Sequence, residues 1–162
     1  MRFRNVVIGI ALTGLAFFFW IHATGTIRDG LEKVVIQNVS QDKKYVMLIP
    51  TNRTVEVGFI HSLYGGRQAE RFLVGADRVL NLQQVKFEVY DALLYYTGGS
   101  HARESREEGF WLIPSDYRTD SIRYILPQRQ REFFVRVGEK VFPAETLGEP
   151  GDAIKIYVGK EP

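Results

Sequence analysis

The chain has 162 residues, of which 21 are Lys or Arg and 19 are Asp or Glu, and it contains no cysteine. Arg2 and Arg4 precede the first apolar stretch, so residues 24–162 keep 19 basic and 19 acidic residues and no net formal charge. This balance argues against a nucleic-acid partner, and the lack of cysteine excludes disulfides, cysteine zinc sites and a thiol nucleophile.

Residues 5–23 contain no charged side chain and are predicted to form a membrane-spanning helix. Nineteen helical residues reach roughly 28 Å, which is close to the thickness of the hydrocarbon core of a bilayer. The small residues Ala23, Thr24 and Gly25 would also suit a signal-peptidase site. We therefore interpret residues 1–23 as a membrane anchor, with a cleaved signal segment as the open alternative.

The basic residues before this segment predict its orientation. Arg2 and Arg4 favour a cytoplasmic N-terminus, and Trp20 lies where an aromatic anchor at the outer interface is expected. We expect a single-pass protein of the cell membrane with an extracytoplasmic domain, or a secreted or periplasmic protein if the segment is cleaved. Residues 24–32 read as a polar stalk, and residues 33–162 as the domain itself.

The domain is predicted to be all-β, because short alternating runs follow one another between turn residues. We expect a small β-sandwich or a partly open barrel of about seven to nine strands. The expected strands lie at residues 34–36, 45–49, 54–62, 69–75, 79–89, 122–126, 133–137 and 154–158.

Residues 91–120 break this pattern and are predicted to be a long irregular insertion. The stretch combines aromatic residues with Gly98-Gly99 and the charged run at residues 103–108. A turn or two of helix would fit at residues 102–108. A long irregular stretch in a small domain is typical of a functional or mobile loop.

The most informative motif is Gly65-Gly66, which lies between two alternating runs and predicts a two-residue β-hairpin. Such a turn would place Phe59 opposite Phe72 and His61 opposite Glu70 on one face of the sheet. Side chains that face each other across strands have Cβ atoms about 4.5–5.5 Å apart, so the imidazole and the carboxylate would form a hydrogen bond.

The His61/Glu70 pair has two interpretations at this stage. It is either a polar pair that stabilises the hairpin or a ligand-binding, acid–base pair. Ser62 would point to the opposite face from His61, so a hydrolase dyad is not expected. His101 is the weak third candidate for a metal site with His61 and Glu70, but the spacing carries no metal signature, so we predict neither a metal nor a cofactor.

The segments Phe59-Ile60-His61-Ser62 and Glu70-Arg71-Phe72 resemble a family of small exported domains of unknown function, domain of unknown function 1850. Arg136-Val137-Gly138 and Pro150-Gly151 resemble the closing part of the same family, so the likeness spans residues 55–158. The resemblance implies an association with TRAP-type solute transporters of the TAXI class. It also implies that His-Ser and the following Glu belong to the shared pattern.

The chain departs from the family at two places. Tyr90-Asp91-Ala92-Leu93-Leu94 stands where the family has a glycine turn, and Leu63-Tyr64-Gly65-Gly66 replaces an acidic loop that contains proline.

We expect a non-catalytic accessory or binding domain that contacts a transporter or its substrate-binding protein. Tyr, Trp and Arg dominate binding hot spots, which makes five residues candidate partner contacts: Tyr64, Arg67, Tyr95, Tyr96 and Trp111. The alternative is a small-ligand- or metal-binding enzyme that uses His61 and Glu70.

Overall fold

Twelve strands and two short helices make up the part of the chain that the structure, a computed structural model, describes: residues 32–99, 105–128 and 132–159. The strands are β1 (Lys33–Asn38), β2 (Lys43–Leu48), β3 (Thr54–Ile60), β4 (Arg67–Val74), β5 (Leu80–Phe87), β6 (Ser105–Glu107), β7 (Phe110–Pro114), β8 (Arg118–Thr119), β9 (Ser121–Ile125), β10 (Phe134–Val137), β11 (Lys140–Pro143) and β12 (Ala153–Gly159). The helices are α2 (Tyr90–Thr97) and α3 (Ala144–Leu147). The all-β prediction is therefore confirmed.

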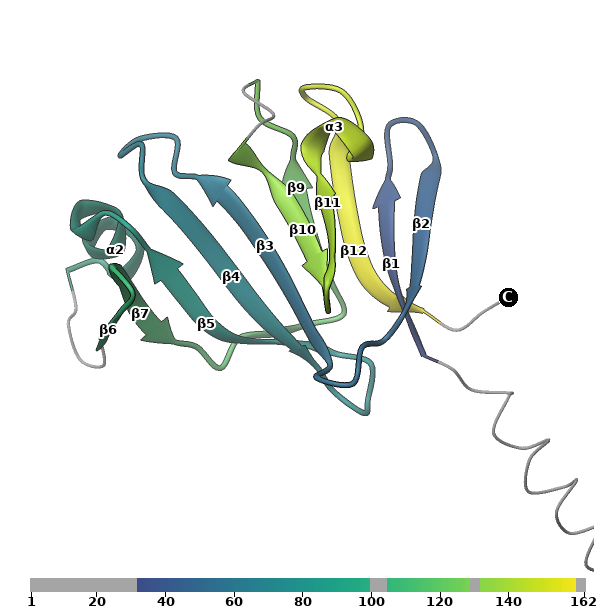
Figure 1. Cartoon of the computed structure of the whole chain (residues 1–162), viewed down its shortest axis with the longest axis horizontal. Coiled ribbons are helices and arrows are strands. Elements are labelled where there is room, and N and C mark those ends of the chain that lie inside the picture. Colours follow the sequence, from purple (N-terminus) through teal and green to yellow (C-terminus); the bar gives the residue numbers. More distant parts are fainter. Residues whose placement is uncertain (1–31, 100–104, 129–131, 160–162) are drawn as a thin grey trace, which may run out of the picture. The chain divides into compact units, whose positions relative to one another are not determined.

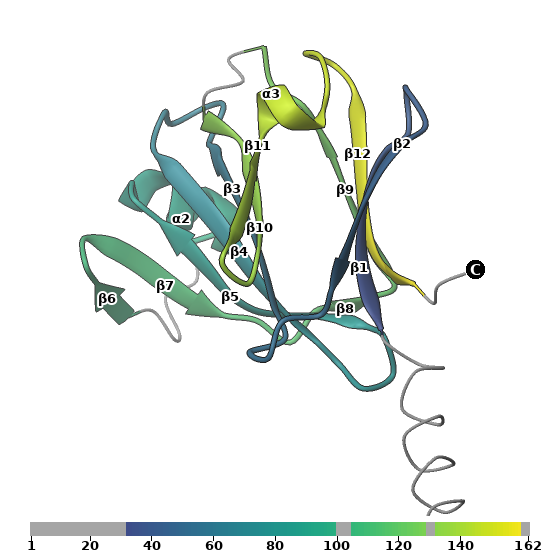
Figure 2. The same ribbon diagram turned by 45° about the vertical axis from the view of Figure 1, so that its right-hand side comes forward.

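The strands form two antiparallel sheets (Figure 1). The smaller sheet has the order β2-β1-β12-β9, and the larger has the order β11-β10-β3-β4-β5-β7-β6, with β8 paired to β5. Figure 2 shows the two sheets as separate layers, with α3 near one end. The first and the last of these strands, β1 and β12, are direct neighbours.

Alternate residues of both sheets meet in one hydrophobic core. The smaller sheet contributes Val34, Ile36, Ile154 and Ile156, and none of these four side chains is exposed. The larger sheet contributes side chains from β3, β4, β5 and β10 to the same cluster. Burying alternate positions in this way is the usual means by which two sheets share one core.

One buried polar residue, Asn38 at the end of β1, ties the sheet to the segment before β12. Its amide donates to the Leu147 carbonyl at 2.9 Å and to Asp152 Oδ2 at 2.7 Å. Asp152 also accepts from Gln41, and these hydrogen bonds, with that from Asn38 the strongest, lower the pKa of its carboxyl. The network fixes the connection between α3 and β12 against the β1–β2 hairpin.

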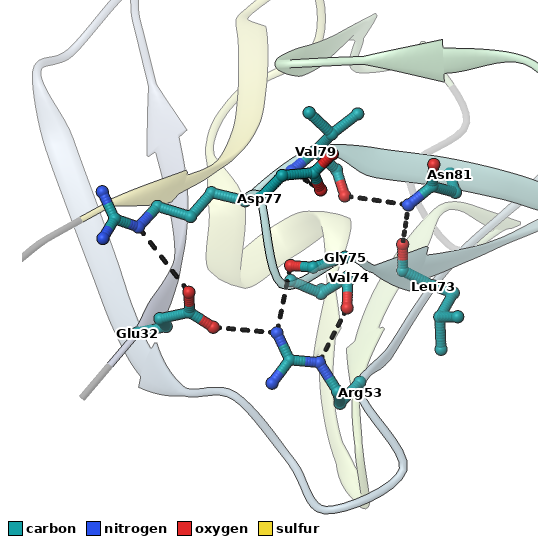
Figure 3. A network of polar contacts seen from close by, with 9 residues as sticks. Glu32, Arg53, Leu73, Val74, Gly75, Asp77, Val79 and Asn81 are labelled. Atoms are coloured by element: carbon teal, nitrogen blue, oxygen red, sulfur yellow. Dashed lines mark hydrogen bonds and ion pairs between the residues drawn. The ribbon is translucent and has the colours of Figure 1, made fainter. Parts of the chain in front are cut away.

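A second network holds the point where the chain enters the domain (Figure 3). Arg53 donates to Glu32 Oε2 at 2.8 Å and to the carbonyls of Val74 and Gly75 at 2.7 and 3.1 Å. Arg78 forms a further ion pair with Glu32 at 3.6 Å. Glu32 was predicted to belong to the stalk, but it is anchored to residues next to β3, β4 and β5.

The stretch that was predicted to be irregular, residues 91–120, is instead mostly ordered into elements. It contains nearly all of α2 and the strands β6, β7 and β8. Helix α2 is capped at its C-terminus by Gly98, whose φ of 61° is the left-handed conformation that glycine adopts readily. The helical turn considered for residues 102–108 is wrong for Ser105–Glu107, which forms β6, and residues 102–104 lie outside the described part.

No helix among the described residues has the length and apolar character needed to cross a membrane. The predicted membrane segment at residues 5–23 lies outside the described residues, and so does the stalk up to residue 31.

Candidate functional site: a groove beside Glu70

The hairpin between β3 and β4 has a longer loop than the sequence predicted. The His61 N–H donates to the Gly66 carbonyl, and the Gly65 N–H donates to the His61 carbonyl, both at 2.8 Å. Four residues, rather than two, therefore lie between the closing pair. Along the strands, Phe59 pairs with Gln68, Val57 with Glu70, and Val55 with Phe72.

The predicted pairing of His61 with Glu70 is therefore wrong. The partner of each β3 residue is displaced by four positions along β4, which is an even number, so every side chain keeps its predicted face. His61 and Glu70 still belong to one face, but they are offset by about 13 Å along the strand. No hydrogen bond or ion pair joins these two described residues.

The two glycines of the loop have different roles. Gly65 has a φ of 75° and open space where a Cβ would lie, so it supplies the left-handed turn position. Gly66 has no positive φ, but an added Cβ would lie 2.3 Å from Val89 Cγ2. A type I′ turn would need both glycines at positive φ, and only Gly65 has one. The hydrogen bond from the His61 N–H to the Gly66 carbonyl closes the loop four residues wide instead.

His61 stabilises the loop with its own side chain. Its Nδ1 accepts from the N–H groups of Leu63 and Tyr64 at 3.3 and 3.4 Å, so this nitrogen is occupied by the turn. The imidazole also lies beside the rings of Tyr64 and Tyr95, with centroids 5.2 and 5.9 Å away. The other ring nitrogen, Nε2, must then carry the proton of the neutral imidazole.

Glu70 is the partly buried carboxylate of this region. The Tyr124 hydroxyl of β9 donates to its Oε2 at 2.6 Å, and the amide of the buried Gln68 donates to its Oε1 at 3.3 Å. Burial raises the pKa of the Glu70 carboxyl, and these two hydrogen bonds oppose that rise. None of the ion pairs within the described residues involves Glu70. Arg123 borders the same hollow, but it is an exposed, outward position of β9 between the inward residues Ile122 and Tyr124.

Two adjoining hollows, which we call the Glu70 groove, lie between β9 and the face of β3 and β4. One has a volume of about 750 Å³ and includes Glu70, and the other, of about 550 Å³, includes His61 and Gln68. Tyr96 and Tyr124 line both hollows. The groove thus brings His61 and Glu70 to one surface feature without bringing them into contact.

Aromatic rings form much of the groove wall. Tyr124 contacts Phe59 and Phe133, with ring centroids 6.0 and 5.8 Å apart. Tyr96 of α2 packs on Phe87 and remains 47% exposed. The pKa of Tyr96 is raised by its burial and by the nearby charge of Glu70. This combination of aromatic rings with one carboxylate suits a cationic group, because both kinds of side chain attract positive charge.

The predicted partner contacts fall into two groups. Tyr95 and Tyr96 line the groove, and Tyr64 lies beside Tyr95, with ring centroids 5.9 Å apart. Arg67 is engaged elsewhere: it forms an ion pair with Glu88 at 3.0 Å and lies over the Phe110 ring.

Trp111 packs against Tyr90 at 4.7 Å on the core side and is not part of the groove lining. His101, the weak third candidate for a metal site, lies outside the described residues. Within the described residues, no three Asp, Glu or His side chains lie close enough to hold a metal ion.

The sequence reasoning missed Tyr124 and Gln68, although it placed both in or beside predicted strands. The only available signal was their position on the apolar face of an alternating run, where a tyrosine hydroxyl or an amide needs a partner. Comparison with family models, with curated proteins and with solved structures found no match.

Proposed function

We propose that the chain is a membrane-tethered extracytoplasmic binding domain and that the Glu70 groove receives a cationic group of its ligand. The observation that carries the proposal is the Glu70 carboxylate, which lines an open groove without an ion-pair partner among the described residues. Its two hydrogen-bond donors, Tyr124 and Gln68, are both neutral.

A cation in the groove would offset the free-energy cost of burying the ionised Glu70 carboxylate. Burial disfavours the ionised form of Glu70, and a neighbouring positive charge favours it. Binding of a cation and ionisation of Glu70 would therefore strengthen each other. The exposed ring of Tyr96 adds a surface over which an ammonium or guanidinium group can lie.

The source of the cation is either a small amine solute or a Lys or Arg side chain of a partner protein. The resemblance to the domains found beside TRAP-type transporters supports a role next to a solute-uptake system, with a transporter or a substrate-binding protein as the partner. The apolar segment at residues 5–23 supports a location at the outer surface of the cell membrane, with the domain held there as a sandwich of two sheets. The offset of about 13 Å between His61 and Glu70 argues against the enzyme alternative that would use them as a direct acid–base pair.

The groove is tested on the full chain in detergent micelles with two matched probes, the methylguanidinium cation and neutral methylurea. We expect methylguanidinium to shift the NMR signals of Gln68, Tyr96 and Tyr124, and methylurea to leave them in place. Glu70→Gln should weaken methylguanidinium binding at least tenfold while the rest of the spectrum stays unchanged. Tyr96→Ala, which removes an exposed ring of the groove wall, should weaken binding less.

An equal response to both probes would contradict a cationic site, as would unchanged affinity in folded Glu70→Gln. The tether is tested separately by alkaline extraction of membranes. The full chain should remain in the membrane pellet, and its appearance in the soluble fraction would contradict an integral anchor.

A further inference from the structure

The outer face of the smaller sheet has an unbalanced charge. Its outward positions alternate with the inward-facing residues of β1, β2, β9 and β12. Among these described strands the outward positions include four cations and no Asp or Glu. The cations are Lys33, Lys44, Arg123 and Lys155. We call this surface the basic sheet face, and its charge contrasts with the neutral balance of residues 24–162.

The strand register aligns three of these cations in one row. Gln37 pairs with Lys44 on one side and with Lys155 on the other, and Lys155 pairs with Arg123. At about 4.8 Å between strands, the row spans roughly 14 Å. Asp42 in the β1–β2 turn lies 4.0 Å from Lys44 and accepts a hydrogen bond from Gln37 in the middle of the row. Both charged side chains are well exposed, so water screens this ion pair and it is weak.

The outer face of the larger sheet provides the contrast. There Glu56 pairs with Arg136 at 2.8 Å and with Arg71 at 3.6 Å, so charges of both signs lie side by side. The outward positions of the larger sheet also hold cations, namely Arg67, Arg71, Lys86 and Arg136, but Glu56 lies among them and pairs with two of them. The smaller sheet differs because its described strands have no acid among their outward positions.

Apolar side chains lie between the cations. Val46 and Leu48 of the edge strand β2 are each 55% exposed, and Ile125 at the other edge is 65% exposed. The Lys155 ammonium lies over the Tyr157 ring at 5.1 Å. Basic and apolar side chains interleaved on one surface are suited to an interface that offers both anionic groups and hydrocarbon.

The entry point of the chain limits the distance between this face and a bilayer. Glu32 is fixed to Arg53 and Arg78, and β1 of the same sheet starts at the next residue (Figure 3). Only residues 24–31 separate this point from the predicted membrane segment, and eight residues span at most about 29 Å. For a surface held so close to a membrane, the effective concentration of lipid is high, which favours binding.

We propose that the basic sheet face lies against a membrane that contains anionic phospholipid. Lys44, Lys155 and Arg123 contact the phosphate groups, and Val46 and Leu48 enter the interfacial layer. The closeness of this face to a bilayer depends on the proposed membrane tether. An acidic protein surface would satisfy the cations but would leave the exposed apolar side chains without hydrocarbon, so the bilayer is the better fit.

The test compares two single-cysteine variants of the full chain, Val46→Cys and Val141→Cys. The chain has no other cysteine, so one fluorophore labels each variant at one position. Both valines are exposed residues of edge strands, Val46 on the basic sheet face and Val141 on the larger sheet. The proteins are reconstituted into vesicles that carry a nitroxide quencher on the lipid headgroup, with phosphatidylcholine either alone or mixed with phosphatidylglycerol.

We expect strong quenching at position 46 only in vesicles with phosphatidylglycerol, with loss of quenching at high salt. Position 141 should be quenched little in both. The double variant Lys44→Gln with Lys155→Gln should weaken the binding of the basic sheet face to the membrane at least tenfold. Each removed charge accounts for about fivefold of this loss. Equal quenching at the two positions would overturn the proposal, and so would quenching at position 46 that ignores the lipid charge.

An acidic peptide is then added as a competitor to the anionic vesicles. If the peptide abolishes the quenching at position 46, the face prefers an acidic protein surface to the membrane, and the proposal is overturned in favour of a protein partner. Alkaline extraction of the same vesicles reports the anchor independently, because it measures retention of the whole chain. A chain that is extracted but still shows the difference between the two labels would contradict the tether and support the basic sheet face.

Discussion

The Tyr124 hydroxyl and the Glu70 carboxylate form a 2.6 Å hydrogen bond that joins β9 of the smaller sheet to β4 of the larger sheet. Both side chains are partly buried, and the bond lies where the two hollows of the groove meet. The same contact therefore holds the sheets together and positions the one carboxylate of the proposed site.

Replacing Tyr124 with Phe should lower the free energy of unfolding by about 1–2 kcal/mol, because the carboxylate loses its closest donor while the ring remains in place. Urea denaturation of the full chain in detergent measures the loss. Combined with Glu70→Gln, the same substitution should cost less than the sum of the two single changes, since the pair acts as a unit. Full additivity would show that the hydrogen bond contributes no coupling.

The raised pKa of Glu70 predicts a specific pH dependence of stability. The folded state holds the proton more tightly than the unfolded state, whose carboxyl titrates near 4.5, so the folded state is favoured at low pH. The contribution of Glu70 to stability should therefore fall as the pH rises from 4.5 through its folded pKa.

Chemical denaturation between acidic and neutral pH checks this sign. Glu70→Gln cannot titrate, so the unfolding free energy of the wild type should decline relative to that of the variant over this range. An opposite trend would mean that a positive group outside the described residues pairs with Glu70.

Gly66 should tolerate a side chain poorly because of its neighbour. Gly66→Ala places a Cβ 2.3 Å from Val89 Cγ2 and should destabilise the domain by about 1–3 kcal/mol. The double change Gly66→Ala with Val89→Ala should recover part of the loss. Gly65→Ala is the matched control, since it meets only the cost of a left-handed conformation, about 1–2 kcal/mol, and should gain nothing from Val89→Ala.

The side chain of His61 should matter for the loop more than for chemistry. His61→Ala removes the acceptor of two backbone N–H groups and should cost about 1 kcal/mol. His61→Asn should restore part of this stability, because asparagine accepts from the same backbone positions in turns. If Ala and Asn behave alike in thermal denaturation, the Nδ1 contacts do not stabilise the loop.

Asn38 should be among the more sensitive polar residues of the domain. Asn38→Ala removes the side-chain donor to the Leu147 carbonyl and one of the donors to Asp152, and it should cost about 1–3 kcal/mol. Gln37→Ala is the control, because the neighbouring amide forms only an exposed hydrogen bond with Asp42. Urea denaturation should show little change for the control.

The alternation of apolar residues predicted the all-β class and most of the long strands. The runs around Val34, Val57 and Ile154 became β1, β3 and β12, because each buries one face. Helix α2 was not predicted, since its eight residues are too few for a clear helical period. The short strands β6 to β8 are defined mainly by their pairing partners, which local sequence does not specify.

Two residues of the candidate groove, His61 and Glu70, were singled out from the sequence, but their contacts were not predicted. His61 and Glu70 both line the groove. The register of β4 against β3 differs from the predicted one by an even number of residues, which leaves each side chain on its predicted face. Hydrophobic alternation therefore cannot distinguish the true register from the predicted one. The contact between Glu70 and Tyr124 joins different sheets across 54 residues, a distance over which local patterns carry no information.

The position of β12 between β1 and β9 affects the order in which the domain assembles. The partner of Lys33 is Gly159, so the smaller sheet depends on contacts between residues made early and late in synthesis. Such a high contact order slows folding. During translation, β1 and β2 can join β9 in one sheet only after β12 has been made. A chain that is shortened before Ala153 lacks β12, so β1 and β9 lose the strand that lies between them.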